Sequence, residues 1–274
     1  MADDTLTDFA REPFTHAGRT HPVLRSGTGP AVIVMAEIPG ITPKVARLAR
    51  RVRDIGCTVV MPDLFGVAGR DPDPKAHGWT GAAVTGLRAA AQICVSREFT
   101  VLASGRTSPV VTWLRALAAH EHERCGGPGV GALGMCFTGG YALAMATDER
   151  LLAPVVCQPS LPLAVTARRR RSLDLSPNDL GAVRQRCAAG LTVLGVRFRG
   201  DRISPADRFA LLREELGEAF VGVEIDDKAA NPEGQLPPHS VLTEHLIDEP
   251  GQPTREALDQ VLDHFRARLL ARTA

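Results

Sequence analysis

The stretch from Gly129 to Gly140, Gly-Val-Gly-Ala-Leu-Gly-Met-Cys-Phe-Thr-Gly-Gly, constrains the fold more than any other part of the chain. Its apolar first half predicts a buried strand over residues 130–135. The second half predicts a helix over residues 137–146, so Cys136 falls on the turn between the two. The stretch is therefore expected to form a strand–turn–helix unit with a cysteine at its apex.

Glycines on both sides of this cysteine suit a sharp turn of that kind. Gly134 lies two residues before Cys136, and Gly139 and Gly140 follow it. A sharp strand-to-helix turn requires strained backbone angles and close packing, which glycine allows. Such a turn would lift the thiol clear of the sheet and point it at a helix N-terminus, which favours a thiolate. The pattern indicates a nucleophile, although a buried core cysteine is the alternative interpretation.

Strands and helices alternate along the rest of the chain. Helical spacing or helix-start signals occur at residues 42–55, 82–93, 108–125, 177–188 and 204–216, and in an amphipathic C-terminal helix. The intervening apolar runs predict strands at residues 31–35, 57–61, 153–157, 191–196 and 220–225. This alternation predicts an α/β protein with a doubly wound, mostly parallel sheet.

The length of 274 residues, 44% of them hydrophobic, is compatible with one large core, and we expect a single domain. Residues 1–15 are expected to be flexible, with a first edge strand at residues 21–25. Residues 66–79 are rich in Gly, Pro and Asp and are expected to form a loop above the carboxyl ends of the strands.

Composition argues against several classes of protein. A net charge of +1 provides no positive electrostatic field that would attract nucleic acid or an anionic membrane. The few aromatic residues also argue against surfaces on which nucleic-acid bases could stack. The six cysteines are scattered without the spacing of a zinc site or a disulfide framework, as expected of reduced thiols. No signal peptide or membrane-length apolar run is present. We expect a cytoplasmic protein without a metal or organic cofactor.

Three motifs carry a resemblance to a known family. They are Gly-x-Cys-x-Gly-Gly around Cys136, Ala-Glu-Ile-Pro-Gly at residues 36–40, and Met-Pro-Asp-Leu-Phe at residues 61–65. In order and spacing, from residue 31 to the C-terminal helix, they resemble the dienelactone hydrolase family. The resemblance implies an α/β-hydrolase fold with a cysteine nucleophile, and a carboxymethylenebutenolidase-like enzyme that cleaves a small-molecule ester or lactone.

A cysteine nucleophile at neutral pH needs a base and an acid that orients it. Asp201 follows the strand at residues 191–196, where a hydrolase of this fold places the acid. His239, in a proline-stiffened loop after the last strand, is the predicted base, with His245 as its rival. The resulting order of nucleophile, acid and base is that of α/β-hydrolases. An N-terminal helix cap is the alternative role for Asp201.

A carboxylate at the end of a buried strand, Glu37, is costly unless it is used. The resemblance implies that Glu37 contacts the resting thiol and helps to transfer its proton, whereas the alternative is a structural ion pair. The backbone N–H groups of Phe137 and Ile38 are the expected oxyanion hole.

The resemblance is incomplete at the substrate carboxylate. Relatives that open dienelactones hold this group with arginines, one of them shortly after the catalytic histidine. Ser-Val-Leu-Thr-Glu follows His239 here, and the candidate replacements are Arg88, Arg106, Arg199 and Arg202. The four arginines at residues 168–171 are interpreted as a solvated loop, with an anion-attracting rim as the alternative.

Two other functions compete with lactone hydrolysis. One is a general carboxylesterase or thioesterase acting on a neutral acyl substrate. The other is a non-catalytic binding protein on a hydrolase scaffold, with Cys136 as a redox-sensitive thiol. We expect a monomer or homodimer under each of them.

Overall fold

The computed structural model describes residues 2–73, 76, 105–234 and 237–271. One eight-stranded sheet runs through the protein in the order β1-β2-β4-β3-β5-β6-β7-β8. The first two strands, β1 (Ala10–His16) and β2 (Arg19–Ser26), are antiparallel to their neighbours. The others are parallel: β3 (Ala31–Met35), β4 (Thr58–Pro62), β5 (Val130–Met135), β6 (Leu151–Cys157), β7 (Val193–Phe198) and β8 (Phe220–Ile225). The predicted α/β class and mostly parallel sheet are confirmed.

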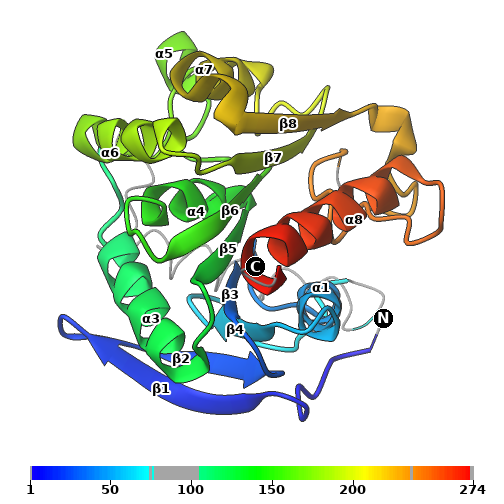
Figure 1. Ribbon diagram of the computed structural model, residues 1–274. Coiled ribbons are helices and arrows are strands. Elements are labelled where there is room, and N and C mark those ends of the chain that lie inside the picture. The colour runs from blue at the N-terminus through cyan, green and yellow to red at the C-terminus, as the bar shows by residue number, and fades with distance from the viewer. Residues whose placement is uncertain (1, 74–75, 77–104, 235–236, 272–274) are drawn as a thin grey trace.

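Helices cover both faces of the sheet. On one face lie α1 (Pro43–Asp54) and α8 (Pro253–Phe265), which a π-helical turn, η4 (Arg266–Leu270), extends. On the other face lie α3 (Val110–Cys125), α4 (Gly139–Met145), α6 (Pro177–Ala188) and α7 (Ala206–Leu216). Figure 1 shows this division, with α1 and α8 on one side of the strands and α3, α4 and α6 on the other. The helix expected at residues 82–93 lies outside the described residues.

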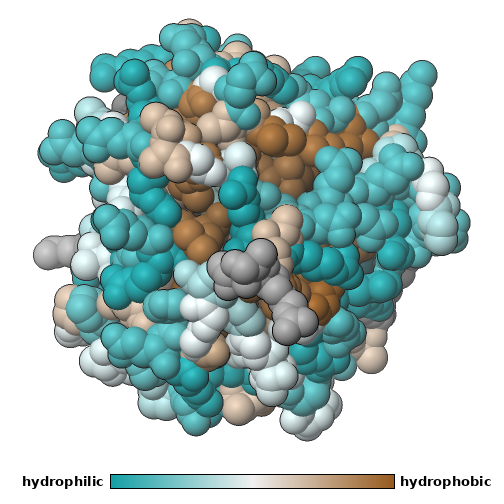
Figure 2. Space-filling view, in the orientation of Figure 1, coloured by the Kyte–Doolittle hydropathy of each residue, from teal (hydrophilic) through white to brown (hydrophobic). Residues whose placement is uncertain are grey.

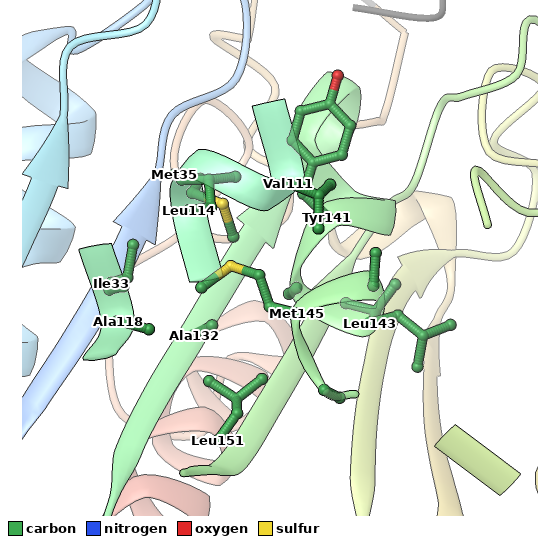
Figure 3. Packing of buried hydrophobic residues seen from close by; sticks show 14 of the residues in the cluster. Ile33, Met35, Val111, Leu114, Ala118, Ala132, Tyr141, Leu143, Met145 and Leu151 are labelled. Atoms are coloured by element: carbon green, nitrogen blue, oxygen red, sulfur yellow. The ribbon is translucent and has the colours of Figure 1, made fainter. Parts of the chain in front are cut away.

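The two layers of core explain why these segments form. The strands β3, β4, β5 and β7 are buried along almost their whole length, as continuous apolar runs covered on both faces must be. In Figure 3, Leu114 from α3 and Met145 from α4 pack beside Ile33 and Ala132 of the sheet. Burial of these layers anchors β5 and α4, and with them the turn that joins the two.

The N-terminal segment corrects one expectation. Residues 10–15 belong to β1, which forms the edge of the sheet by pairing with β2, so this part of the chain is not a frayed end. Before it, Leu6 and Phe9 are buried, and Arg50 forms ion pairs with Asp4 and Asp8. The strand expected at residues 21–25 is therefore second in the sheet. Polar spacing in residues 10–16 hid a strand whose side chains are mostly exposed.

The surface is mixed in character. Hydrophilic side chains cover most of the face in Figure 2, with apolar patches near the middle of the view. The arginines at residues 168–171 lie at and beside the short helix α5 (Ala167–Arg170), where Arg170 and Arg171 form surface ion pairs with Asp207 and Glu214. Within the described residues, no helix combines the length and apolar character that crossing a membrane requires.

Candidate active site

Cys136 lies at the apex of the predicted turn, between β5 and α4. Its φ angle is +51°, a left-handed conformation that is strained for a residue with a side chain. A Cβ atom on Gly134 would lie 2.2 Å from the Thr138 carbonyl oxygen, and one on Gly139 would lie 2.6 Å from the Cα of Pro159. The expected need for glycine on both sides of the turn is confirmed at these two positions.

Thr138 joins this turn to the end of β3. Its hydroxyl oxygen accepts the N–H of Met135 at 3.0 Å and lies 3.0 Å from the carbonyl oxygen of Met35. Phe137 and Ile38 are the residues expected to form an oxyanion hole. The hydrogen bonds of Thr138 therefore join the two backbone segments to which they belong. Phe65, from the third sequence motif, packs edge-on against the Phe137 ring with 5.7 Å between centroids.

The predicted acid and base meet at the same edge of the sheet. His239 Nδ1 lies 2.6 Å from Asp201 Oδ2, and both side chains are buried. The other oxygen of Asp201 accepts the N–H groups of Ile203 and Ser204, at 2.9 and 3.1 Å. Asp201 thus holds the loop that follows it and orients the imidazole of His239. The alternative role as a helix cap is wrong, because α7 has Pro205 at its N-cap and no side-chain hydrogen bond there.

The remaining ring nitrogen of His239, Nε2, is buried without a hydrogen-bond partner of good geometry among the described residues. Burial by itself lowers the pKa of His239, but the hydrogen bonds and charges of Asp201 and Cys136 outweigh it and raise the pKa to about 10. A thiolate on Cys136 and an imidazolium on His239 therefore stabilise each other, so a proton that moves from the thiol to His239 is held there.

His245 occupies a different position. Its Nδ1 accepts the backbone N–H of His239 at 3.5 Å, and its ring packs edge-on against Phe198. The geometry therefore pairs His239, rather than His245, with the carboxylate of Asp201.

Glu37 is buried, and its hydrogen bonds differ from those that the resemblance implied. Its carboxylate accepts the hydroxyl of Ser240 at 2.6 Å and that of Thr243, and lies 3.4 Å from the amide nitrogen of Gln158. These bonds go to the His239 loop and to the end of β6, not to the thiol of Cys136. Glu37 also makes no ion pair within the described parts of the chain, so neither expected contact is found.

Ser160 is a neighbour of the thiol that sequence reasoning did not assign to the site. The Cys136 thiol donates to Ser160 Oγ at 3.5 Å, and the Ser160 N–H donates to the Cys136 carbonyl at 2.9 Å. The position of Ser160, three residues past a buried parallel strand, was its only signal. Gln158, two residues earlier, has a φ angle of +32°, which marks a second strained turn here.

Of the arginines proposed to hold a substrate carboxylate, three are described. Arg106, Arg199 and Arg202 are exposed, and Arg199 donates to the Glu224 carbonyl. Arg88 lies outside the described residues. In the part of the chain that the structure describes, no three His, Cys, Asp or Glu residues cluster as metal ligands would.

Comparisons with known proteins agree with this architecture. Residues 19–226 match the family model described as the dienelactone hydrolase family. Among solved structures, a dienelactone hydrolase from Anabaena variabilis is similar at 16% identity and a TM-score of 0.52, over 95% of this chain and 98% of that one. No curated protein matches this chain.

Two further structures cover nearly the whole of both chains. The α/β-hydrolase GrgF from a Penicillium species has 16% identity and a TM-score of 0.60, over 96% of this chain and 99% of that chain. A dienelactone hydrolase-like promiscuous phosphotriesterase from metagenomic libraries has 17% identity and a TM-score of 0.58, over 95% and 98%. These likenesses show the α/β-hydrolase fold.

Proposed function

Because the chain belongs to the dienelactone hydrolase family, we propose that it hydrolyses an ester or lactone bond, with Cys136 as nucleophile, His239 as acid and base, and Asp201 as the group that orients His239. The observation that carries this proposal is the 2.6 Å contact between Asp201 and His239 beside a cysteine held at a φ angle of +51°. Convergence of these three groups is what a nucleophilic triad requires.

Acylation begins with the thiolate. The Cys136 proton moves to His239 Nε2, and the sulfur attacks the carbonyl carbon of the substrate to form a tetrahedral intermediate. The N–H groups of Phe137 and Ile38 donate to its oxyanion. The imidazolium of His239 then protonates the leaving alkoxide, which leaves a thioester on Cys136 and a neutral imidazole.

Deacylation uses the same groups. The neutral imidazole removes a proton from a water molecule, which attacks the thioester carbonyl, and the thiolate leaves as the acid is released. Ser160 lies 3.5 Å from the sulfur, so its hydroxyl can turn and donate to the thiolate in this state.

Glu37 serves a positioning role in this proposal. Its hydrogen bonds with Ser240 and Thr243 tie the His239 loop to the end of β3, which also carries Ile38. The base and one oxyanion donor are then fixed to each other by one buried carboxylate.

A neutral substrate fits this site better than a carboxylated lactone. Ile38, Leu163 and Ile203 follow the carboxyl ends of β3, β6 and β7 and are 43%, 39% and 47% exposed. Thr243 lies in the segment where relatives place an arginine, and its hydroxyl donates a hydrogen bond to Glu37. Exposed apolar side chains at this edge of the sheet and the buried carboxylate of Glu37 favour an uncharged acyl group.

A substrate panel tests both levels of the proposal. The purified protein is expected to hydrolyse 4-nitrophenyl acetate and butyrate with a kcat/KM at least about tenfold above that for a carboxylated dienelactone, because charge burial costs more than a kcal/mol. Paraoxon, a phosphotriester, is the third arm. A preference for the carboxylated lactone would overturn the substrate assignment, and hydrolysis of paraoxon alone would overturn ester hydrolysis.

A further inference from the structure

A buried arginine, Arg208, binds the backbone turn that follows β6, next to the candidate site. Arg208, on α7, is fully buried. Its Nη1 donates to the Pro159 carbonyl at 2.5 Å, and its Nη2 donates to the carbonyls of Pro162 and, at 3.4 Å, Arg169. Burying a charged guanidinium costs free energy unless hydrogen bonds or an opposite charge compensate for the lost water.

The charge of Arg208 is not neutralised by a carboxylate in contact. Arg197, which is also buried, forms an ion pair with Glu224 at 2.5 Å. Arg208 has no such pair among the described residues, and its Nε is buried without a hydrogen-bond partner there. Burial lowers the pKa of Arg208 to about 10, against the opposing effect of Asp201 and Cys136, so it stays charged at neutral pH.

The backbone that Arg208 holds is the turn that meets the nucleophile. Ser160 lies between the two proline carbonyls that the guanidinium binds, and its N–H and hydroxyl both contact Cys136. We propose that Arg208 is a positioning residue of the site: it fixes the turn at residues 159–162 against Cys136, and its charge stabilises the Cys136 thiolate.

The buried cation of Arg208 lies among groups of opposite charge. Among the described residues, the charges that act on Arg208 include those of Asp201, Cys136 and Asp174, which favour its cation, and the like charge of Arg170, which opposes it. A thiolate at Cys136 and the carboxylate of Asp201 gain from a cation in a poorly solvated region, where charges act strongly on each other. The inference rests on the proposed function only in taking Cys136 as the nucleophile.

The test measures the thiol without any substrate. The rate of iodoacetamide labelling of Cys136 is measured against pH by peptide mapping, which gives a pH midpoint for each variant. The thermal unfolding temperature of each variant is measured as well. Arg208→Met is expected to raise the midpoint of labelling by about one pH unit. Arg208→Lys keeps the charge but loses the planar guanidinium. Its midpoint is expected to lie between those of the wild type and Arg208→Met. Ser160→Ala is expected to raise the midpoint as well, since the thiolate loses a donor.

Arg186 provides the matched control. It holds the other end of β6, where its Nη1 donates to the carbonyls of Ala146, Asp148 and Leu151 at 2.6 to 2.8 Å. Arg186→Met is expected to lower the unfolding temperature without moving the Cys136 midpoint. An unchanged midpoint in Arg208→Met would show that Arg208 is structural only. If that variant does not fold, an unchanged midpoint in Ser160→Ala would contradict the contact through which Arg208 is proposed to act. Because labelling needs no turnover, these results are independent of whether the protein hydrolyses esters.

Discussion

Replacing Cys136 with alanine is expected to lower kcat for a neutral aryl ester by a factor on the order of 10⁴ to 10⁶, because the acyl-enzyme can no longer form. Alanine is chosen over serine because a serine oxygen could itself attack the carbonyl. The substitution removes one sulfur from a half-buried position and leaves the turn, with its φ angle of +51°, in place. Initial rates of 4-nitrophenol release measure the effect.

Cys125→Ala is the control for this substitution. Cys125 ends α3 and is half-buried; it precedes the amino end of β5, whereas Cys136 follows the carboxyl end of that strand. Its loss is expected to leave kcat unchanged. A Cys136→Ala variant that kept wild-type hydrolysis would remove Cys136 from the mechanism. A wild type without any hydrolytic activity would support the non-catalytic interpretation, in which the scaffold binds a ligand and Cys136 is a redox-sensitive thiol.

Asp201→Asn is expected to lower kcat by about 10⁴-fold, the scale of the same change in a serine protease triad. The oxygen that accepts the N–H groups of Ile203 and Ser204 would stay in place, so the new NH₂ group would face His239 Nδ1. Nδ1 must then accept, which puts the ring proton on Nε2. A histidine in that tautomer cannot take the proton of Cys136.

The same variant should also change the pH dependence of the thiol. Burial lowers the pKa of His239, and the hydrogen bond that His239 donates to Asp201 is the largest effect that raises it. Without the carboxylate the imidazolium is less stable, so labelling of Cys136 is expected to need a higher pH. Asp207→Asn, which removes an exposed partner of Arg170 on α7, is the control. Equal activity of Asp201→Asn and wild type would remove Asp201 from the mechanism.

Much of the fold was predictable because buried parallel strands leave a plain signal. The apolar runs at residues 31–35 and 130–135 coincide with β3 and β5, and the Pro177 start signal coincides with α6. The edge strand β1 was missed because exposure on both faces removes the alternation that marks a strand. Edge strands are defined by their partner, here β2, more than by their own residues.

The candidate site was predictable to the extent that chain order determines position. Cys136, Asp201 and His239 each follow a parallel strand, and the carboxyl ends of such strands share one edge of the sheet. Side-chain partners were harder, because a hydrogen bond depends on rotamers and loop paths. Glu37 therefore proved to bind the His239 loop, and Arg208, an arginine within an ordinary helix, carried no sequence signal at all.

The most direct measurement of the central claim is the site of covalent modification by 4-nitrophenyl N-methylcarbamate, a substrate analogue whose carbamoyl group leaves an enzyme slowly. Inactivation is expected to place one carbamoyl group per chain on the peptide that carries Cys136, with activity falling in proportion to its occupancy. Loss of activity with the group on another residue, such as Ser160, or full carbamoylation of Cys136 with activity retained, would contradict a cysteine nucleophile.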